Sequence, residues 1–123
     1  MKRPSKKELF GKLRDAKAAV RNEDVFLIDP DVIAEDAIEL GYDIGSELLE
    51  VLAELLGKTS VSHYAGFRPP QRSYKREIQG LELFPFVVDS RRFTCRVYFK
   101  FALSRGSLWL VSLHQDRPIE DSA

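Results

Sequence analysis

Residues 93–104 read Phe-Thr-Cys-Arg-Val-Tyr-Phe-Lys-Phe-Ala-Leu-Ser, and the character of the side chains alternates with a period of two. Every odd position, from Phe93 to Leu103, is apolar. The even positions are polar, cationic or small: Thr94, Arg96, Tyr98, Lys100, Ala102 and Ser104. Because successive side chains of a strand point to opposite faces, we expect a strand with one apolar face and one face that offers hydrogen-bond donors.

A second strand is expected at residues 108–114, Leu-Trp-Leu-Val-Ser-Leu-His, after Arg105-Gly106-Ser107. A two-residue turn would place Tyr98 opposite Leu113 and mix the two faces. A three-residue loop keeps them separate, and the pairs are then Phe99 with Leu113, Phe101 with Val111, Leu103 with Trp109, Tyr98 with His114 and Lys100 with Ser112. A one-residue slip reverses every side chain, so we expect the three-residue loop, with Tyr98 beside His114.

The length of 123 residues predicts a single domain, residues 1–123, with one hydrophobic core. We expect residues 1–57 to be mainly helical, residues 58–118 to form an antiparallel sheet half that carries the site, and residues 119–123 to be an acidic tail. No apolar run approaches the roughly 20 residues of a membrane span, and no apolar segment follows the basic N-terminus. With Cys95 as the only cysteine, a cytoplasmic protein without membrane contact is expected.

The formal charge of zero conceals a strong segregation of charge along the chain. Residues 1–22 carry eight lysines and arginines and two acids, and residues 23–57 carry eleven acids and no lysine or arginine. Residues 58–118 carry eleven lysines and arginines and four acids. Because the local field matters more than the sum, the sheet half can bind a polyanion such as RNA.

Helices are expected before strands, which predicts the α+β class: a small twisted antiparallel sheet with N-terminal helices packed on one face. The expected helices are residues 5–20, 29–40 and 43–56; the other expected elements are a short strand or tether at 25–28, an edge strand at 59–64, a loop at 65–73 and a strand at 81–88. The third helix carries an acidic stripe of Asp43, Glu47, Glu50 and Glu54. That stripe is either a solvated face or a docking surface for a basic partner.

Both histidines, His63 and His114, lie in the cationic half, and histidine can exchange a proton near neutral pH. RNA cleavage without a metal needs a base for the 2′-hydroxyl, an acid for the departing 5′-oxygen, and cations for the phosphate. Tyr98, His114, Lys100 and His63 are the candidate catalytic residues, and Arg68, Lys75, Arg96 and Arg117 are the candidate phosphate-binding residues. We expect no metal and no cofactor, because the chain has no Cys/His pair at ligand spacing and no Gly-rich phosphate loop.

Other interpretations fit the same residues. His114 can be a solvated side chain at a strand end, and Tyr98 an aromatic residue at the rim whose hydroxyl stays in water. The cationic face would then belong to a non-catalytic module that binds RNA or a protein. A structural partner protein with an incidental basic face is the third interpretation.

Three short segments carry a resemblance to a known family: Val-Tyr-Phe-Lys-Phe at 97–101, Val-Ser-Leu-His at 111–114 and Glu-Leu-Gly-Tyr-Asp at 39–43. They resemble the motility quorum-sensing regulator (MqsR) toxins, RelE-like mRNA interferases of bacterial toxin–antitoxin pairs. The resemblance implies a small RelE-like endoribonuclease without a metal, which cleaves mRNA and is neutralised by a cognate antitoxin. It leaves open whether the ribosome takes part.

The resemblance also implies site residues. The family's catalytic tyrosine falls on Tyr98, and a family lysine falls on His114, which is a departure from the pattern. The family's other site lysine and glutamine fall within residues 62–82, where His63 or Lys75 and Glu82 are candidates.

Overall fold

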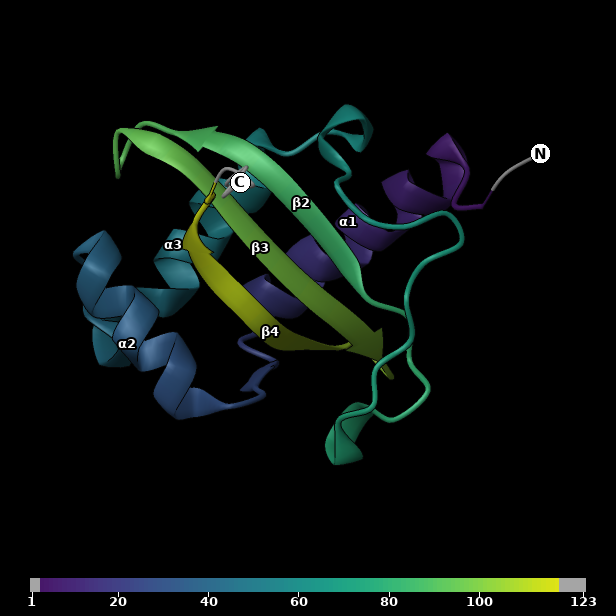
Figure 1. Ribbon diagram of the computed structural model, residues 1–123, viewed down its shortest axis with the longest axis horizontal. Helices are drawn as coiled ribbons and strands as arrows, with labels where there is room; N and C mark the ends of the chain where they lie inside the picture. The colour runs from purple at the N-terminus through teal and green to yellow at the C-terminus, as the bar shows by residue number, and fades with distance from the viewer. Residues whose placement is uncertain (1–2, 118–123) are drawn as a thin grey trace, which may run out of the picture.

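The computed structural model describes residues 3–117 of the chain. Three α-helices and a four-stranded sheet make up this part (Figure 1). In chain order the elements are α1 (Lys6–Arg21), β1 (Val25–Leu27), α2 (Pro30–Leu40), α3 (Ile44–Lys58), the short 3-10 helices η1 (Val61–His63) and η2 (Arg76–Ile78), then β2 (Phe84–Ser90), β3 (Cys95–Ser104) and β4 (Ser107–Gln115). The expected acidic tail, residues 119–123, lies outside the described residues.

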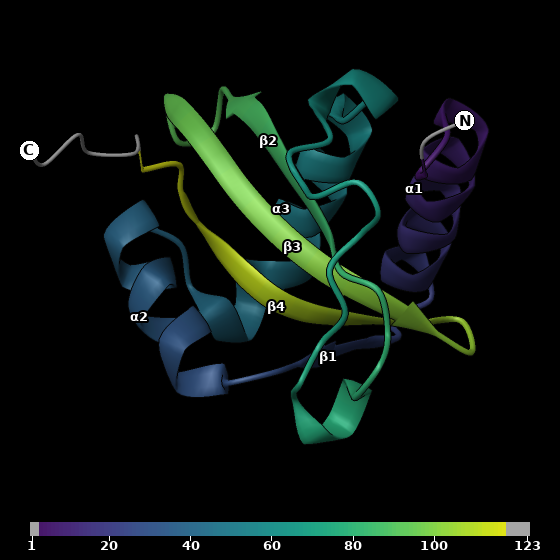
Figure 2. The same cartoon turned by 45° about the vertical axis from the view of Figure 1, so that its right-hand side comes forward.

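The α+β class is confirmed, with a sheet whose strand order is β1-β4-β3-β2. Strands β2, β3 and β4 are antiparallel, whereas β1 pairs parallel with β4 and makes the sheet mixed. Helices α1 and α3 cover one face, and α2 lies alongside β4 (Figures 1 and 2). The opposite face, which we call the open face, is left to the side chains of the strands and to the loop before β2.

The helices begin and end within two residues of their predicted bounds, because the chain supplies the caps. The Ser5 hydroxyl accepts a hydrogen bond from the Glu8 amide at 3.1 Å, and the Asp43 carboxylate accepts one from the Ser46 amide at 3.0 Å. Gly41 ends α2 with a φ of 93°, in the left-handed region that favours glycine.

The apolar face of β3 packs toward α1 and α3, as predicted. Phe84 and Phe86 of β2 and Phe99 and Phe101 of β3 are almost completely inaccessible, and their ring centroids lie 5.8–6.4 Å apart. Leucines of the two helices, including Leu9 and Leu52, belong to the same core. This aromatic layer holds β2 and β3 against the helices.

The expected three-residue loop between β3 and β4 is wrong. The hairpin closes through the two residues Arg105 and Gly106, whose φ values of 53° and 83° are both left-handed. Leu103 therefore pairs with Leu108, and Phe101 pairs with Leu110.

A β-bulge then restores the predicted pairing further along the hairpin. Val111 is the extra residue of β4, so that Lys100 lies opposite Ser112 and Tyr98 lies opposite His114. The bulge shifts the register by one residue, which cancels the effect of the shorter turn. The two predicted pairs on the open face are therefore confirmed.

The expected edge strand at residues 59–64 is also wrong. Residues 61–63 form the 3-10 helix η1, because the Ser60 amide and hydroxyl bind the His63 side chain, and only Tyr64 forms a bridge, to Phe86. The following loop runs along the outer edge of β2, where the Ala65 amide donates to the Pro85 carbonyl at 2.9 Å. This loop covers backbone that a sheet edge would otherwise expose.

The acidic stripe of α3 has a partner within the chain. Arg92, in the turn between β2 and β3, binds the carboxylates of Glu47, Glu50 and Glu54. The sequence predicts either a solvated face or a docking surface for another protein, and neither interpretation includes Arg92 as the partner. The stripe fixes the β2–β3 turn against α3, and Asp43 serves as the cap of the helix.

Candidate functional site

Tyr98 of β3 and His114 of β4 form a stacked pair on the open face of the sheet. Their ring centroids lie 5.1 Å apart and the ring planes differ by 17°. Directly opposed strand residues are close enough for such a contact, and the bulge at Val111 supplies the register that opposes them. Lys100 and Ser112 form the next pair along the hairpin, so four polar side chains share one patch.

The Tyr98 hydroxyl stays protonated near neutral pH. Burial raises the pKa of Tyr98 above its usual value, and the negative charge of Asp116 raises it further. The ring is half-buried between the strands. Tyr98 therefore presents a hydrogen-bond donor to a ligand on this face.

The His114 ring is oriented by its own strand. Nδ1 lies 2.8 Å from the Gln115 carbonyl oxygen, and because a carbonyl can only accept, we assign the proton of the neutral ring to Nδ1. Nε2 is then the unprotonated nitrogen. His114 thus offers a proton acceptor next to the Tyr98 donor.

Lys100 places a positive charge beside this pair. Its side chain is half-buried, and burial lowers the pKa of its ammonium group. No carboxylate forms an ion pair with Lys100 among residues 3–117. A desolvated cation without a counter-ion is suited to binding an anionic ligand.

Two predicted phosphate-binding residues lie near the pair and are engaged in ion pairs: Arg96 on β3, and Arg117 just after the end of β4. Arg96 lies 3.6 Å from Asp89 across the strands. Arg117 lies 3.6 Å from Asp36 and 3.5 Å from Glu39 on α2. Because both arginines are exposed, these ion pairs are screened by solvent and can be exchanged for a phosphate.

Three other predicted site residues are not brought to the pair. The His63 ring nitrogen Nδ1 accepts a hydrogen bond from the Ser60 amide at 2.9 Å, and η1 lies beyond β2 from Tyr98. Arg68 donates to the Pro4 carbonyl at 2.9 Å, at the start of α1. Lys75 forms an ion pair with Asp29 at 2.9 Å, at the start of α2.

Glu82, the candidate for the family's glutamine, is occupied by a different interaction. Arg3 binds its carboxylate with two hydrogen bonds, at 2.8 and 2.9 Å. These bonds lower the pKa of Glu82, and the positive charges of Arg72 and Lys12 contribute to the same shift. Glu82 is therefore a carboxylate already matched by cations.

The loop between η1 and η2 exposes two aromatic side chains that the search for site residues missed. Phe67 is 69% exposed and Tyr74 is 91% exposed. Residues 65–76 also contain four lysines and arginines and no acid. This mixture of aromatic and cationic residues is visible in the sequence and could have indicated a nucleic-acid-binding loop.

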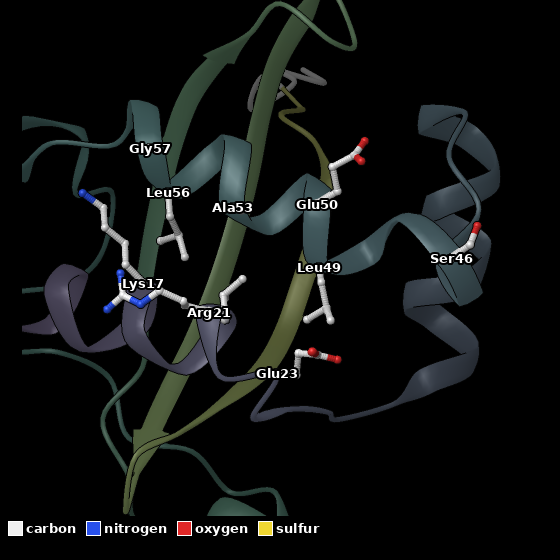
Figure 3. Close-up of a pocket in the computed structure, with 10 residues that line it drawn as sticks. Lys17, Arg21, Glu23, Ser46, Leu49, Glu50, Ala53, Leu56 and Gly57 are labelled. Atoms are coloured by element: carbon white, nitrogen blue, oxygen red, sulfur yellow. The ribbon is translucent and has the colours of Figure 1, made fainter.

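A groove on the helix side offers no comparable chemistry. It has a volume of about 720 Å³ between α1 and α3. Figure 3 shows Lys17 and Arg21 on the α1 side, Leu49 and Leu56 projecting from α3 toward them, and Glu50 projecting from α3 in the opposite direction. Histidine and tyrosine are missing from the lining of this groove, and Glu50 is already bound by Arg92. The groove is an apolar depression, whereas the open face carries the acid/base groups.

Within residues 3–117, no three His, Cys, Asp or Glu side chains are grouped so that they could hold a metal ion. None of the helices in this part is long and apolar enough to cross a membrane. Comparison with protein-family models and with curated proteins finds no match for the chain. The MqsR resemblance therefore remains a prediction, and the open face is the basis for assigning a function.

Proposed function

We propose that this protein is a toxin-type endoribonuclease that cleaves mRNA by acid/base chemistry without a metal. The observation that carries the proposal is the stacked Tyr98–His114 pair beside Lys100. A proton acceptor, a proton donor and an uncompensated cation lie together on one face. These are the groups that cleavage of a phosphodiester next to a 2′-hydroxyl requires.

In the proposed reaction, Nε2 of His114 takes the proton of the 2′-hydroxyl, and the 2′-oxygen attacks the adjacent phosphorus. The bond from phosphorus to the 5′-oxygen breaks, and Tyr98 gives its proton to that oxygen. The products are a 2′,3′-cyclic phosphate and a 5′-hydroxyl. Lys100 stabilises the charge that builds up on the non-bridging oxygens.

The biological setting that we propose rests on the MqsR resemblance. A cytoplasmic mRNA interferase would be inhibited by a cognate antitoxin, with the ribosome as an optional partner. The lysine of the family pattern is replaced by His114, which can act as a base where lysine mainly supplies charge. We therefore propose a larger catalytic role for His114, near the end of β4, than the family pattern gives to its lysine.

A non-catalytic RNA- or protein-binding module is the second candidate function. The raised pKa of Tyr98 favours it, because a tyrosine that holds its proton more tightly is a weaker acid. Both functions would use the same cationic face. They differ in their products, since cleavage yields fragments with cyclic-phosphate ends and binding alone yields none.

The proposal is tested by single-turnover cleavage of a long mRNA, with and without translating ribosomes. We expect His114→Ala and Tyr98→Phe each to slow cleavage by roughly 10²–10⁴, the contribution of a positioned acid or base. Binding of a 2′-deoxy analogue should change far less, because these groups act mainly in the transition state. Stability should be nearly unchanged, which fluorescence of the single tryptophan, Trp109, can follow.

His63→Ala separates the two histidines. We expect this variant to cleave, because η1 holds His63 away from the pair. Loss of cleavage with His63→Ala and not with His114→Ala would move the site to η1. A wild-type protein that binds RNA and yields no fragments under any condition would leave the binding module as the function.

A further inference from the structure

The loop between η1 and η2 presents a surface that the fold itself does not need. We call residues 67–76 the loop patch; its members are the aromatic residues Phe67 and Tyr74 and the cations Arg68, Arg72, Lys75 and Arg76. Tyr74 is 91% exposed, so it contributes almost nothing to packing. Single exposed apolar residues are common on proteins, but two aromatic rings among four cations form a pattern with a physical use.

The loop patch is held in a defined conformation. The Leu83 amide donates to the Gln71 carbonyl at 2.8 Å, and the Ser73 amide donates to the Leu81 carbonyl at 2.9 Å. At the other end, the Tyr64 hydroxyl donates to the Phe67 carbonyl at 2.5 Å. A patch that is already ordered loses little conformational entropy when it binds a ligand.

The positive charge of the loop patch is positioned without being neutralised. Arg68 donates to the Pro4 carbonyl and Arg72 donates to the Gly80 carbonyl, both at 2.9 Å. Carbonyl oxygens orient a guanidinium group and leave its net charge in place. Among the described residues only Lys75 forms an ion pair, with Asp29, although Arg72 is near enough to Glu82 to help lower the pKa of that carboxylate. The loop patch therefore keeps most of its charge for a polyanion.

The η2 end of the loop patch adjoins the open face of the sheet. Ile78 of η2, two residues after Arg76, packs in one cluster with Ala102 of β3 and Trp109 of β4. Ala102 shares the face of Tyr98 and Lys100, since alternate residues of a strand point to the same side. Figure 2 shows this loop passing beside the hairpin on the side away from α1. An RNA strand bound at the Tyr98–His114 pair can thus extend along this face toward the η2 end of the loop patch, where Tyr74, Lys75 and Arg76 lie.

We infer that the loop patch binds single-stranded RNA, with bases stacked on Phe67 and Tyr74 and phosphates on the neighbouring arginines. The choice of RNA as the ligand rests on the proposed function. Exposed aromatic rings stack bases of any sequence, and cations beside them follow the backbone. A duplex keeps its bases stacked on each other and cannot use these rings. The ligand class is therefore unpaired RNA of at least several nucleotides.

The test measures binding by fluorescence anisotropy of a labelled 2′-O-methyl single strand of about 12 nucleotides, which cannot be cleaved through a 2′-hydroxyl. We expect Phe67→Ser and Tyr74→Ser each to weaken binding about tenfold, the usual effect of removing a stacking side chain. Tyr74→Phe should bind as the wild type does, because the ring is retained. Phe10→Ser, 66% exposed on α1, is the matched control and should also bind normally. Binding of a blunt RNA duplex should be unchanged in all four variants.

The outcomes separate this inference from the proposed function. If Phe67→Ser and Tyr74→Ser bind single-stranded RNA normally and the wild type cleaves RNA, the inference is overturned. The two exposed rings would then be assigned to binding a protein partner. Equal weakening of duplex and single-strand binding also overturns it, because stacking would not discriminate. If those variants bind single-stranded RNA more weakly and the wild type does not cleave RNA, the inference that the loop patch binds RNA is supported. The proposed nuclease function is then rejected.

Discussion

The two faces of β3 alternate residue by residue and yet serve different purposes. On the helix side Val97, Phe99 and Phe101 are fully buried in the aromatic layer. On the open face Tyr98 and Lys100 are half-buried, one stacked on a histidine and the other without a carboxylate partner. One strand therefore combines a stabilising surface with a reactive one.

The contrast shows how a small domain can tolerate groups that are unfavourable for folding. Burial disfavours the charge of Lys100, and nothing in the described part of the chain compensates it with an opposite charge. The phenylalanines behind it bury large apolar areas, each of which contributes a few kcal/mol. The packing of these phenylalanines on the helix side holds β3 in place, and β3 in turn positions Tyr98 and Lys100 on the open face.

Removing a ring from the helix side should have the largest effect on stability. We expect Phe101→Ala to lower the free energy of unfolding by roughly 3–5 kcal/mol, because it leaves a cavity in the aromatic layer. Urea unfolding followed by Trp109 fluorescence measures the change. Lys100→Ala is the control on the open face and should cost far less. The reverse order of the two variants would mean that the faces are exchanged and the site is misplaced.

Much of this fold could be predicted because local signals and tertiary packing agree. Ser5, Gly41 and Asp43 mark helix ends by their own chemistry, and the alternation in residues 93–104 separates the two faces of β3. The hairpin turn could not be predicted in the same way. Residues 108–111 are all apolar, so alternation carries no information at the bulge, and Arg105 in the left-handed region is unusual for a residue with a side chain.

The candidate site was predictable in part for the same reason. Tyr98, Lys100 and His114 lie on two neighbouring strands, where the alternation of side chains places them on one face. Their predicted pairing holds because the bulge at Val111 offsets the turn that is one residue shorter than expected. The positions of His63, Arg68 and Lys75 depend on the path of a long loop, which sequence patterns do not encode. The partners of charged residues, such as Arg92 with the acidic stripe, are also long-range and emerge only in three dimensions.

Tyr42 on the helix side and Tyr98 on the open face allow the two faces to be compared through the same type of side chain. Tyr42 packs against Phe93 in the core of the helix side, and its hydroxyl has no hydrogen-bond partner among residues 3–117. Burial, together with the charge of Asp36, raises the pKa of Tyr42 to about 12. Tyr98 also has a raised pKa, but it lies on the open face, where the proposed ligand would bind.

We expect Tyr42→Phe to raise the free energy of unfolding by about 1 kcal/mol near neutral pH, because it removes a buried polar atom that lacks a partner. The variant should also resist alkali better. Between pH 10 and about 12 the unfolded wild type loses the Tyr42 proton and the folded protein keeps it, so wild-type stability falls by about 1.4 kcal/mol per pH unit from this group. Urea unfolding across this range measures both effects, and an equally steep alkaline decline in the variant would contradict the assignment.

The smallest expected effect concerns the charge on the open face. Because burial lowers the pKa of Lys100, the folded protein binds this proton less tightly than the unfolded chain does. The wild type should therefore gain stability from this group as pH rises toward the unfolded pKa of about 10.4. Lys100→Met lacks the titrating group, so it should be slightly more stable than the wild type at pH 7, by no more than about 0.5 kcal/mol, and the difference should shrink toward pH 10. Lys17→Met, at an exposed position of α1, is the matched control for the loss of one lysine side chain and its charge. A Lys100→Met variant that is clearly less stable at pH 7 would mean that the ammonium group stabilises the fold through a counter-ion, and the open face would then lose the free cation on which the proposed chemistry depends.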